Sequence, residues 1–453
     1  MKQDPEITVY ITNKNYSKYI RNAINSVLKQ SFKNVELIII DDASTDNSKK
    51  IINSYKEKKN IKIIFNKKSI GLLKSSNIAI KSSKGKFVLR LDADDYLDIN
   101  ALSVLYLAIK KNPNIAMIYS DYYLVDEKKN IISLEKQIYR QKNYLGREPV
   151  LAACCLIRKS ALFSVNLYDE RFNRQDGYDI WYKLIRNYQI KHVPLPLFFY
   201  RRHGQNLTTN KSKLFKTRTK ILKKFARQKL NFKNLNINCV IPVRGKESDI
   251  NCNSLELLNK KPLIFHTIDH ALKVKEFKNV IVTTSDKKLI SIIQKKYKKK
   301  IKYHKRKENL SSINTDYKVS IISALKKFRE NKTDILVVLT MENPYRQSHY
   351  IVQAISNLII NESDLVIGTK PDIENNYYIY SNNSIKLISN QNKDKLKLEK
   401  NIILKEVGSF SVYKYSSYIK NKINKITNIV LDDQDSMLIN NKLELNILNK
   451  LKK

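Results

Sequence analysis

Apolar and polar positions alternate along the first half of the chain in blocks that predict short buried strands and amphipathic helices. Ile7–Ile11, Val35–Ile40 and Ile61–Phe65 have the length and the β-branched composition of buried strands. Between them, Ser17–Gln30 and Gly71–Ser82 repeat apolar residues at helical spacing. Because strands and helices alternate, the pattern predicts an α/β domain whose parallel sheet has right-handed crossovers.

The most informative strand of this half, Phe87–Leu91, runs directly into Asp92, Asp94 and Asp95. A strand this apolar belongs in the middle of a sheet, and open α/β sheets bind ligands at the carboxyl ends of their strands. Asp92 and Asp94 can share Mg²⁺ or Mn²⁺ while the rest of the metal's shell stays open for phosphate oxygens. The alternative is an Asp-rich turn that only ends the strand.

A second acidic strand end supports the ligand interpretation. Val35–Ile40 ends in Asp41 and Asp42, so two acidic strand ends are expected at one edge of the sheet. A carboxylate at Asp42 can accept hydrogen bonds from a base or a ribose hydroxyl, while a metal at Asp92 and Asp94 neutralises phosphates. The two together predict a nucleotide-diphosphate pocket. The sequence has neither a Walker A motif nor Gly-x-Gly-x-x-Gly, so metal is expected to hold the phosphates.

These segments resemble the nucleotide-sugar domain of the family 2 glycosyltransferases, which has a GT-A fold. The resemblance covers roughly residues 5–208 and rests on VYITNKN, VELIIIDDASTDNS, GLLKSSNIAIKSSKGKFVLRLDADD, RQDGYDIWYKLI and FFYRRHGQNLT. It implies inversion at the sugar anomeric carbon by direct displacement. It also implies that Asp42 contacts the nucleoside and that Asp92 and Asp94 bind the metal. The residues expected at the nucleotide-sugar site are Asn15, Asp41, Asp42, Asn77, Asp92 and His203.

An inverting transfer needs a base that removes the proton of the acceptor hydroxyl. Asp176 is favoured because Gly177 beside it lets the chain bend and a substrate come close. Asp179 is the alternative base, or else a residue that only stabilises the first turn of a helix. His203 can approach the diphosphate or the metal, or serve the structure alone. Ser76 stands where this family often has Arg, and Asp176 lies one residue further upstream than usual.

Residues 208–236 contain no Asp or Glu. Apolar residues alternate there with Lys and Arg, which predicts a basic amphipathic helix. One interpretation is a linker helix packed on its own domain. The other is a peripheral contact of residues 211–230 with an anionic membrane, where lipid-linked acceptors lie.

A second α/β pattern starts at Asn238 and is large enough for a separate domain. Besides the first strand, in CVIPVRG, the expected strands are Asn279–Thr283, Asp334–Leu339 and Asp364–Gly368. The expected helices are Pro262–Lys273, Asp286–Lys296, Asp316–Phe328 and Asp433–Leu448.

This half resembles the cytidylyltransferases that activate sialic acid and related acidic sugars. The similar segments are CVIPVRG, KKPLI, FHTIDHAL, VIVTTSD, RKENLS, LTMENPYR and VLDDQD. The residues that the resemblance places at a second nucleotide site are Arg244, Lys246, Arg346 and Asp435. The phosphate loop departs from the family, because it contains Glu247 and Asp249 and has Asn253 in place of a Lys. Carboxylates oppose a triphosphate, so little CMP-sugar synthesis is expected.

Composition adds a strong positive charge, with 85 Lys and Arg against 42 Asp and Glu and a net charge of +43. Because Lys, Asn and Ile are abundant throughout and Gly is scarce, coding bias explains much of this charge. No aromatic-interleaved Arg patch or zinc-finger spacing supports nucleic-acid binding. The four Cys form no Cys-x-x-Cys pair, and no apolar run reaches the roughly 18–20 residues of a membrane span. A cytoplasmic protein is expected, with or without a peripheral membrane contact.

The sequence therefore predicts two Rossmann-like nucleotide-binding domains in tandem, at residues 1–210 and 237–453, joined by a basic linker helix at 211–236. The leading hypothesis is an inverting glycosyltransferase that uses a nucleotide-sugar donor, with a UDP-sugar favoured, and a glycan or lipid-linked acceptor. One alternative is a bifunctional enzyme that also makes a CMP-activated acidic sugar. The other is a non-catalytic basic protein that binds membranes or nucleic acid.

Overall fold

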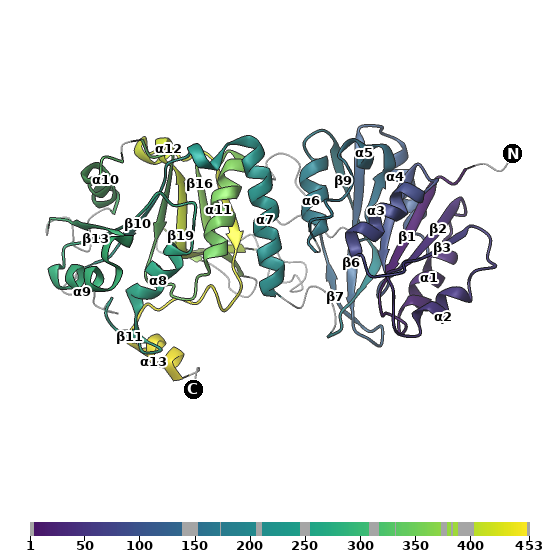
Figure 1. Cartoon of the computed structure of the whole chain (residues 1–453), viewed down its shortest axis with the longest axis horizontal. Helices are drawn as coiled ribbons and strands as arrows, with labels where there is room; N and C mark the ends of the chain where they lie inside the picture. Colours follow the sequence, from purple (N-terminus) through teal and green to yellow (C-terminus); the bar gives the residue numbers. More distant parts are fainter. Residues whose placement is uncertain are drawn as a thin grey trace. The chain divides into compact units, whose positions relative to one another are not determined.

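The computed structural model describes residues 4–137, 153–172, 174–204, 211–244, 254–307, 317–330, 332–372, 378–381, 384–387 and 403–450. It divides into two compact units (Figure 1). The first comprises Met1–Tyr144 and Glu148–Ile221, and the second comprises Leu145–Arg147 and Leu222–Lys453. The division falls within helix α7 (Lys211–Lys229). The predicted domain limits, residues 1–210 and 237–453 with a separate linker at 211–236, stay a prediction.

The first unit is built on a nine-stranded sheet with the order β3-β2-β1-β4-β8-β6-β9-β5, and β7 pairs with β6. The first four strands are β1 (Ile7–Asn13), β2 (Val35–Asp41), β3 (Ile61–Phe65) and β4 (Phe87–Asp92). They are parallel, as predicted. The sheet as a whole is mixed, since β8 runs antiparallel to both β4 and β6, while β6 and β9 pair in parallel. The other strands are β5 (Tyr96–Leu97), β6 (Ile115–Val125), β7 (Ile131–Glu135), β8 (Leu156–Arg158) and β9 (Gln189–Arg201).

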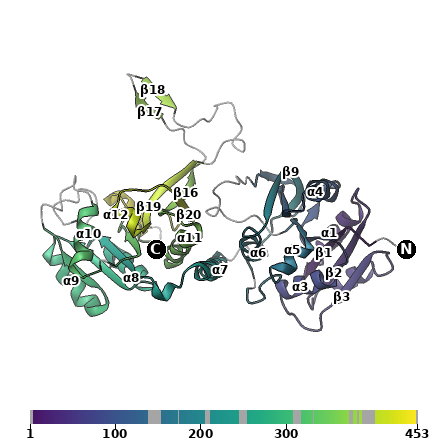
Figure 2. The same ribbon diagram turned by 90° about the horizontal axis from the view of Figure 1, so that it is seen from above.

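Alternate residues of these strands build the core between the sheet and its helices. Val9, Ile11 and Leu89 are fully buried in one cluster with side chains of α1 and α4. Helix α3 lies on the other side of the sheet from α1 and α4 (Figure 2). The helices of this unit are α1 (Ile20–Leu28), α2 (Ser48–Asn53), α3 (Leu72–Ser82), α4 (Ala101–Lys110), α5 (Lys159–Ser164) and α6 (Asp176–Leu184).

The second unit has a seven-stranded sheet with the order β14-β13-β10-β15-β19-β16-β20. Its first four strands are parallel, and β19 enters antiparallel between β15 and β16. The strands of the sheet are β10 (Ile237–Pro242), β13 (Asn279–Thr284), β14 (Lys302–Lys305), β15 (Ile335–Leu339), β16 (Leu365–Asp372), β19 (Ile403–Lys414) and β20 (Ile426–Val430). Two small hairpins are β11 (Leu257–Leu258) with β12 (Lys261–Pro262), and β17 (Tyr378–Ser381) with β18 (Ser384–Leu387).

Three of the remaining helices, at residues 263–272, 287–297 and 317–327, lie where the sequence predicted them, whereas the helices at 348–361 and 415–419 were not predicted. The remaining helices are η2 (Phe232–Asn234), α8 (Leu263–Leu272), α9 (Lys287–Tyr297), η4 (Lys298–Lys300), α10 (Tyr317–Lys327), α11 (Ser348–Asn361), α12 (Tyr415–Ile419) and α13 (Lys442–Lys450). The closing helix was predicted to begin at Asp433 but begins at Lys442. Asn441 accepts the Glu444 N–H at 2.9 Å, and the Glu444 carboxylate accepts the Asn440 N–H at 2.6 Å. This reciprocal pair caps the helix nine residues later than expected.

Candidate functional site

The carboxylates of the DADD turn meet a histidine from the end of β9. Asp94 Oδ2 lies 2.9 Å from His203 Nε2, although 109 residues separate the two in sequence. The imidazole stacks on Tyr19 at 5.1 Å between ring centroids and meets the edge of Tyr16 at 5.8 Å. Burial, with the negative charges of Asp94 and Asp92, raises the pKa of Tyr16, which keeps its phenol neutral. The structure thus joins two residues that the sequence placed at the donor site separately.

Arg201, the last residue of β9, ties that strand to the turn. Its backbone N–H donates to Asp95 Oδ1 at 2.8 Å, and its Nε donates to the Asp94 carbonyl at 2.9 Å. Asp95 is 1% exposed. Burial, followed by the negative charges of Asp94 and Asp92, raises the pKa of Asp95 well above its ordinary value. Asp95 is therefore best described as an anchor of the turn, with Asp94 next to it facing His203.

Asp92 has a cationic neighbour that sequence reasoning missed. Arg90 lies two residues earlier in β4, so its side chain points to the same side of the sheet as that of Asp92. Arg90 Nε is 3.0 Å from Asp92 Oδ1, and the Arg90 side chain is only 6% exposed. A buried guanidinium thus balances one of three neighbouring carboxylates. The i, i+2 spacing of Arg90 and Asp92 in a strand was the available signal.

The register of the sheet brings the second acidic strand end to the same edge. Thr12 of β1 pairs with Asp92 of β4 on one side, and Asn13 pairs with Asp41 of β2 on the other. Asp41 is fully buried and accepts hydrogen bonds from Asn13 Nδ2 at 2.8 Å and from the Ser44 N–H at 2.9 Å. Its described contacts hold the β2 turn in place.

Asp42 organises the loop that leads into α3. Its carboxylate accepts four hydrogen bonds of 2.7–2.9 Å, from Asn66 Nδ2, Ser69 Oγ, and the N–H groups of Ile70 and Gly71. Gly71 has φ +92, a conformation that side chains disfavour. Burial by itself raises the pKa of Asp42, but these hydrogen bonds bring the net pKa below its ordinary value. The carboxylate accordingly stays ionised and shapes the predicted nucleoside pocket through this loop.

We expect Asp42→Ala to lower the free energy of unfolding by about 2 kcal/mol, because four donors lose their acceptor. Ser69→Ala removes one of these donors and is expected to cost about 1 kcal/mol or less. Denaturant unfolding of both variants measures the difference. Equal stability of Asp42→Ala and the wild type would contradict the anchoring role.

The amide side chains predicted at this site also bind protein groups. Asn15, at φ 61, accepts the Thr45 N–H at 2.8 Å. Asn77 Nδ2 donates to the Tyr168 carbonyl at 3.0 Å and to Glu170 Oε1 at 2.9 Å, and Asn77 Oδ1 accepts the Tyr168 N–H at 3.1 Å. Asn77 therefore links α3 by hydrogen bonds to the segment that precedes α6. Both candidate bases, Asp176 and Asp179, lie in α6.

The two candidate bases differ in what the structure describes. Asp176 is the first residue of α6, but its side chain lies outside the described residues. Asp179 is fully buried, with its Oδ2 2.8 Å from Lys183 Nζ and 3.2 Å from the Asp169 N–H. Lys183 Nζ also donates to the Leu167 carbonyl at 2.6 Å. These contacts favour a structural role for Asp179.

In the second unit, two arginines meet at the carboxyl ends of β10 and β14. Arg244 Nε donates to the Tyr317 hydroxyl at 3.0 Å. Arg306 is 3% exposed, and its Nη2 donates to the Val243 carbonyl at 2.9 Å. Burial, together with the positive charge of Arg244, lowers the pKa of Arg306. Arg306 was noted only as part of RKENLS, so its place beside Arg244 is a new feature of this site. Lys246 lies outside the described residues.

Of the other two residues predicted for the second nucleotide site, Arg346 faces the protein interior, and Asp435 is described through its backbone carbonyl. Arg346 is fully buried, and its Nη2 donates to the Thr340 carbonyl at 2.9 Å and to Thr267 Oγ1 at 3.2 Å. The Asp435 carbonyl accepts from Asn343 Nδ2 at 2.9 Å. Among the described contacts, none joins either residue to Arg244. Arg346 lies in the interior of the unit.

The metal prediction has mixed support in the described residues. No group of three or more His, Cys, Asp or Glu side chains among them converges closely enough to hold a metal ion by itself. Asp94 and His203 do converge, and Mg²⁺ is commonly bound through one or two carboxylates plus substrate phosphates. The residue types therefore fit a cation whose shell the donor completes. Among the described helices, none is both long and apolar enough to cross a membrane.

Comparisons with known proteins agree with the two resemblances. Residues 8–171 match the family described as glycosyl transferase family 2, and residues 238–432 match the family described as cytidylyltransferase. An uncharacterized glycosyltransferase of Methanocaldococcus jannaschii is 30% identical over 176 residues, covering 38% of this chain and 61% of that protein. Chondroitin synthase of Escherichia coli is 28% identical over 217 residues, covering 47% of this chain and 31% of that protein.

The chain thus covers less than two thirds of the length of these relatives. A solved structure of S. aureus TarS 1–349 in complex with UDP-GlcNAc has a TM-score of 0.40 and 20% identity, covering 49% of this chain and 66% of that chain. The chain carries, in tandem, a segment that matches the family 2 glycosyltransferases and a segment that matches the cytidylyltransferases, as the sequence predicted.

Proposed function

We propose that the protein is a cytoplasmic, inverting glycosyltransferase that uses a nucleotide-sugar donor, with a UDP-sugar favoured, and a glycan or lipid-linked acceptor. The observation that carries the proposal is the contact between Asp94 and His203 at the carboxyl end of β4. Asp42 follows β2, which β1 separates from β4 in the sheet. It holds the loop between β3 and α3 at the same edge of the sheet. Acidic and imidazole side chains at this edge support the proposal, because ligands bind at the carboxyl ends of the strands in an open α/β sheet.

In the proposed reaction, the acceptor hydroxyl oxygen attacks the anomeric carbon of the donor sugar. Asp176 takes the hydroxyl proton as the new glycosidic bond forms. The bond between the anomeric carbon and the diphosphate oxygen breaks, and the diphosphate leaves with the electron pair. Asp94 and His203, with Asp92 beside them, would hold Mg²⁺ or Mn²⁺, which supplies charge neutralisation for the departing diphosphate.

A thermal-shift screen of UDP, GDP and CDP, each with and without Mn²⁺, tests the donor class. A ligand that binds only the native state raises the melting temperature. The proposal expects the largest rise with UDP and Mn²⁺ together, followed by transfer from a UDP-sugar to a glycan acceptor. A chain that responds to none of the three diphosphates, with or without Mn²⁺, contradicts it.

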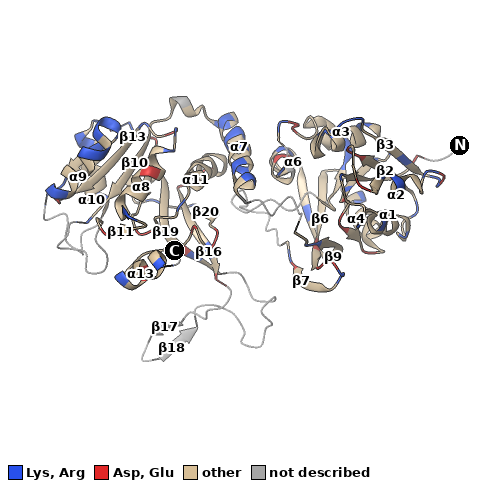
Figure 3. Ribbon diagram, turned by 60° about the horizontal axis from the view of Figure 1, so that its bottom comes forward, with Lys and Arg blue, Asp and Glu red and all other residues tan. Residues whose placement is uncertain are grey.

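A peripheral membrane contact through residues 211–230 is a further part of this proposal. Lys and Arg residues run along α7 (Figure 3). Three of its apolar side chains, Leu222, Phe225 and Ala226, are buried in the structure. A contact of α7 with an anionic membrane is therefore expected to be electrostatic, without insertion of these side chains.

For the second unit, we expect little or no synthesis of a CMP-sugar by the full chain. The meeting of Arg244 and Arg306 favours a nucleotide site, but the phosphate loop contains Glu247 and Asp249 and lacks a Lys at Asn253. The loss of one such contact typically costs on the order of 3 kcal/mol, about a hundredfold in rate. Pyrophosphate release from CTP with a panel of acidic sugars measures the activity. Robust release that disappears in Arg244→Ala would establish the bifunctional alternative.

A further inference from the structure

A cavity of about 340 Å³ opens in the second unit at the amino ends of β13 and β14. Its wall includes Asn279, the first residue of β13, and Lys302, the first residue of β14. Arg244 and Arg306 follow the carboxyl ends of parallel strands in the same sheet. The cavity therefore lies at the opposite edge of the sheet from the candidate nucleotide site, and no function described above uses it.

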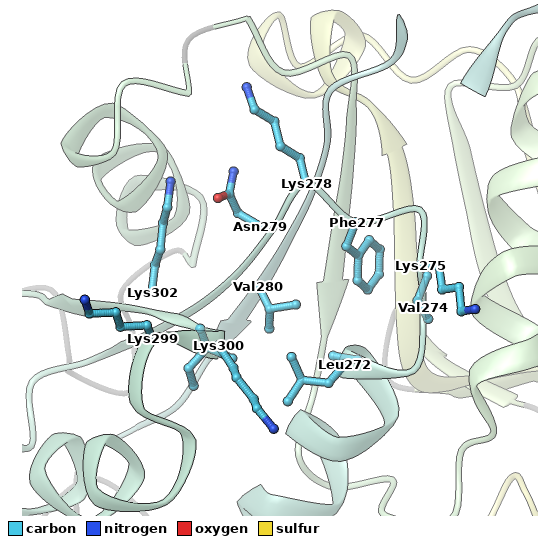
Figure 4. A pocket seen from close by; sticks show the side chains of 12 residues that line it. Leu272, Val274, Lys275, Phe277, Lys278, Asn279, Val280, Lys299, Lys300 and Lys302 are labelled. Atoms are coloured by element: carbon cyan, nitrogen blue, oxygen red, sulfur yellow. The ribbon is translucent and has the colours of Figure 1, made fainter. Parts of the chain in front are cut away.

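Lysines surround this cavity, and aliphatic and aromatic side chains form its floor (Figure 4). The lysines are Lys275, Lys278, Lys299, Lys300 and Lys302. Leu272, Val274, Phe277 and Val280 lie between them. A volume of this size is at the lower end of the range of small-molecule sites, roughly 300–1,000 Å³. The lining is typical of a site for an anionic group attached to an apolar body.

The lysines are only partly neutralised by the protein. Glu330 is the carboxylate that reaches them, with its oxygens 3.1 Å from Lys278 Nζ and 3.3 Å from Lys302 Nζ. Lys275, Lys299 and Lys300 make no ion pair with any described residue. These three exposed cations are available to a ligand.

The carboxyl ends of two helices at the cavity also offset part of the positive charge of the lysines, but their partial charges are smaller than that of a carboxylate. Helices α8 and α9 end next to it, at Leu272 and Tyr297. A helix carboxyl end carries about half a negative charge. Five lysine charges against Glu330 and two helix ends leave about three positive charges at the cavity. This excess of positive charge is larger than the charge needed to neutralise the carboxyl ends of the two helices.

The surrounding segment extends this positive field. Residues 295–307 contain nine Lys or Arg residues and no Asp or Glu. In α9, Lys287, Lys288, Lys295 and Lys296 are exposed, and blue marks Lys and Arg on this helix in Figure 3. Such a segment raises the local concentration of anionic ligands by long-range attraction.

We propose that this cavity binds a phosphate ester, with the phosphate attracted by the positive charges of Lys275, Lys299 and Lys300 at its rim and the apolar part of the ligand over Phe277. Phosphate is the favoured anion because its charge of up to two suits a site with about three excess positive charges. The ester comes either from a soluble molecule or from the head group of an anionic lipid. Both present the same chemistry to the cavity.

The test measures binding of two probes to the full chain at low ionic strength. Phenyl phosphate, compared with inorganic phosphate, represents a soluble ester. Vesicles of phosphatidylcholine and phosphatidylglycerol in equal parts, compared with phosphatidylcholine alone, represent the lipid. Each lysine is expected to contribute roughly fivefold to binding, so the triple variant Lys275→Ser, Lys299→Ser, Lys300→Ser should bind about a hundredfold more weakly.

The matched control is the triple variant Lys56→Ser, Lys58→Ser, Lys59→Ser, which removes the same charge from exposed positions of the first unit. It should bind like the wild type. The double variant Lys299→Ser, Lys300→Ser gives a second measurement, with an expected loss of about 25-fold. Hydrogen exchange should show protection of residues 271–280 and 299–302 by the bound probe.

Binding of phenyl phosphate, with inorganic phosphate weaker, supports the proposal and identifies a soluble ester. Binding of anionic vesicles alone, weakened in the cavity variant but not in the control, supports it and identifies a lipid. Equal weakening in the cavity variant and the control shows attraction by net charge only and overturns the proposal. Absence of binding of both probes, or protection confined to other segments, overturns it as well.

Discussion

Asp94→Ala is expected to reduce glycosyl transfer by about a thousandfold or more. Asp94 contacts His203 at the carboxyl end of β4, and in the proposed function it holds a divalent cation against the donor diphosphate. The loss of such a cation removes several kcal/mol of transition-state stabilisation, and each 1.4 kcal/mol is about tenfold in rate. Initial rates with a UDP-sugar and Mn²⁺ measure the effect, and titration of UDP with and without Mn²⁺ shows whether metal-dependent binding is lost too.

Two controls separate the metal role from a loss of charge or of fold. Glu57→Ala removes one carboxylate from an exposed position of the first unit and should keep full activity. His203→Asn should weaken Mn²⁺-dependent UDP binding in the same direction as Asp94→Ala. Full activity of the wild type in EDTA is the result that rules out the metal role.

Asp176→Asn is expected to lower turnover by about a hundredfold or more while UDP binding and stability stay near those of the wild type. Asparagine keeps the shape of the side chain but cannot accept the proton of the acceptor hydroxyl. Asp179→Asn should behave differently, because Asp179 is fully buried and pairs with Lys183, whose side chain is 14% exposed. Removal of one partner of a buried ion pair costs about 3 kcal/mol or more.

The two variants are therefore distinguished by measuring turnover and denaturant unfolding on both. The assignment predicts a stable, inactive Asp176→Asn and a destabilised Asp179→Asn. If instead Asp179→Asn is stable and inactive while Asp176→Asn is near normal, Asp179 is the base and the roles exchange.

The sequence by itself determined the α/β alternation and the two resemblances. Runs such as Ile7–Ile11 and Val35–Ile40 are mostly apolar, which suits strands buried on both faces, and the structure has β1 and β2 there. Local rules also placed Asp42 and Asp92 at carboxyl strand ends. Both inferences depend on neighbours in the chain, so spacing and composition suffice for them. Matches to the two families at residues 8–171 and 238–432 confirm the resemblances.

Only the tertiary structure decided which distant groups meet and which polar side chains the protein uses itself. Asp94 meets His203 because β9 returns to the sheet beside β6 and ends at the DADD turn. Asp42 and Asn77 satisfy their hydrogen bonds on loops that lie far away in sequence. Arg346 matches a family position but is fully buried among carbonyl groups. Residue type does not reveal these outcomes, because a buried polar group takes whatever partner the packing provides.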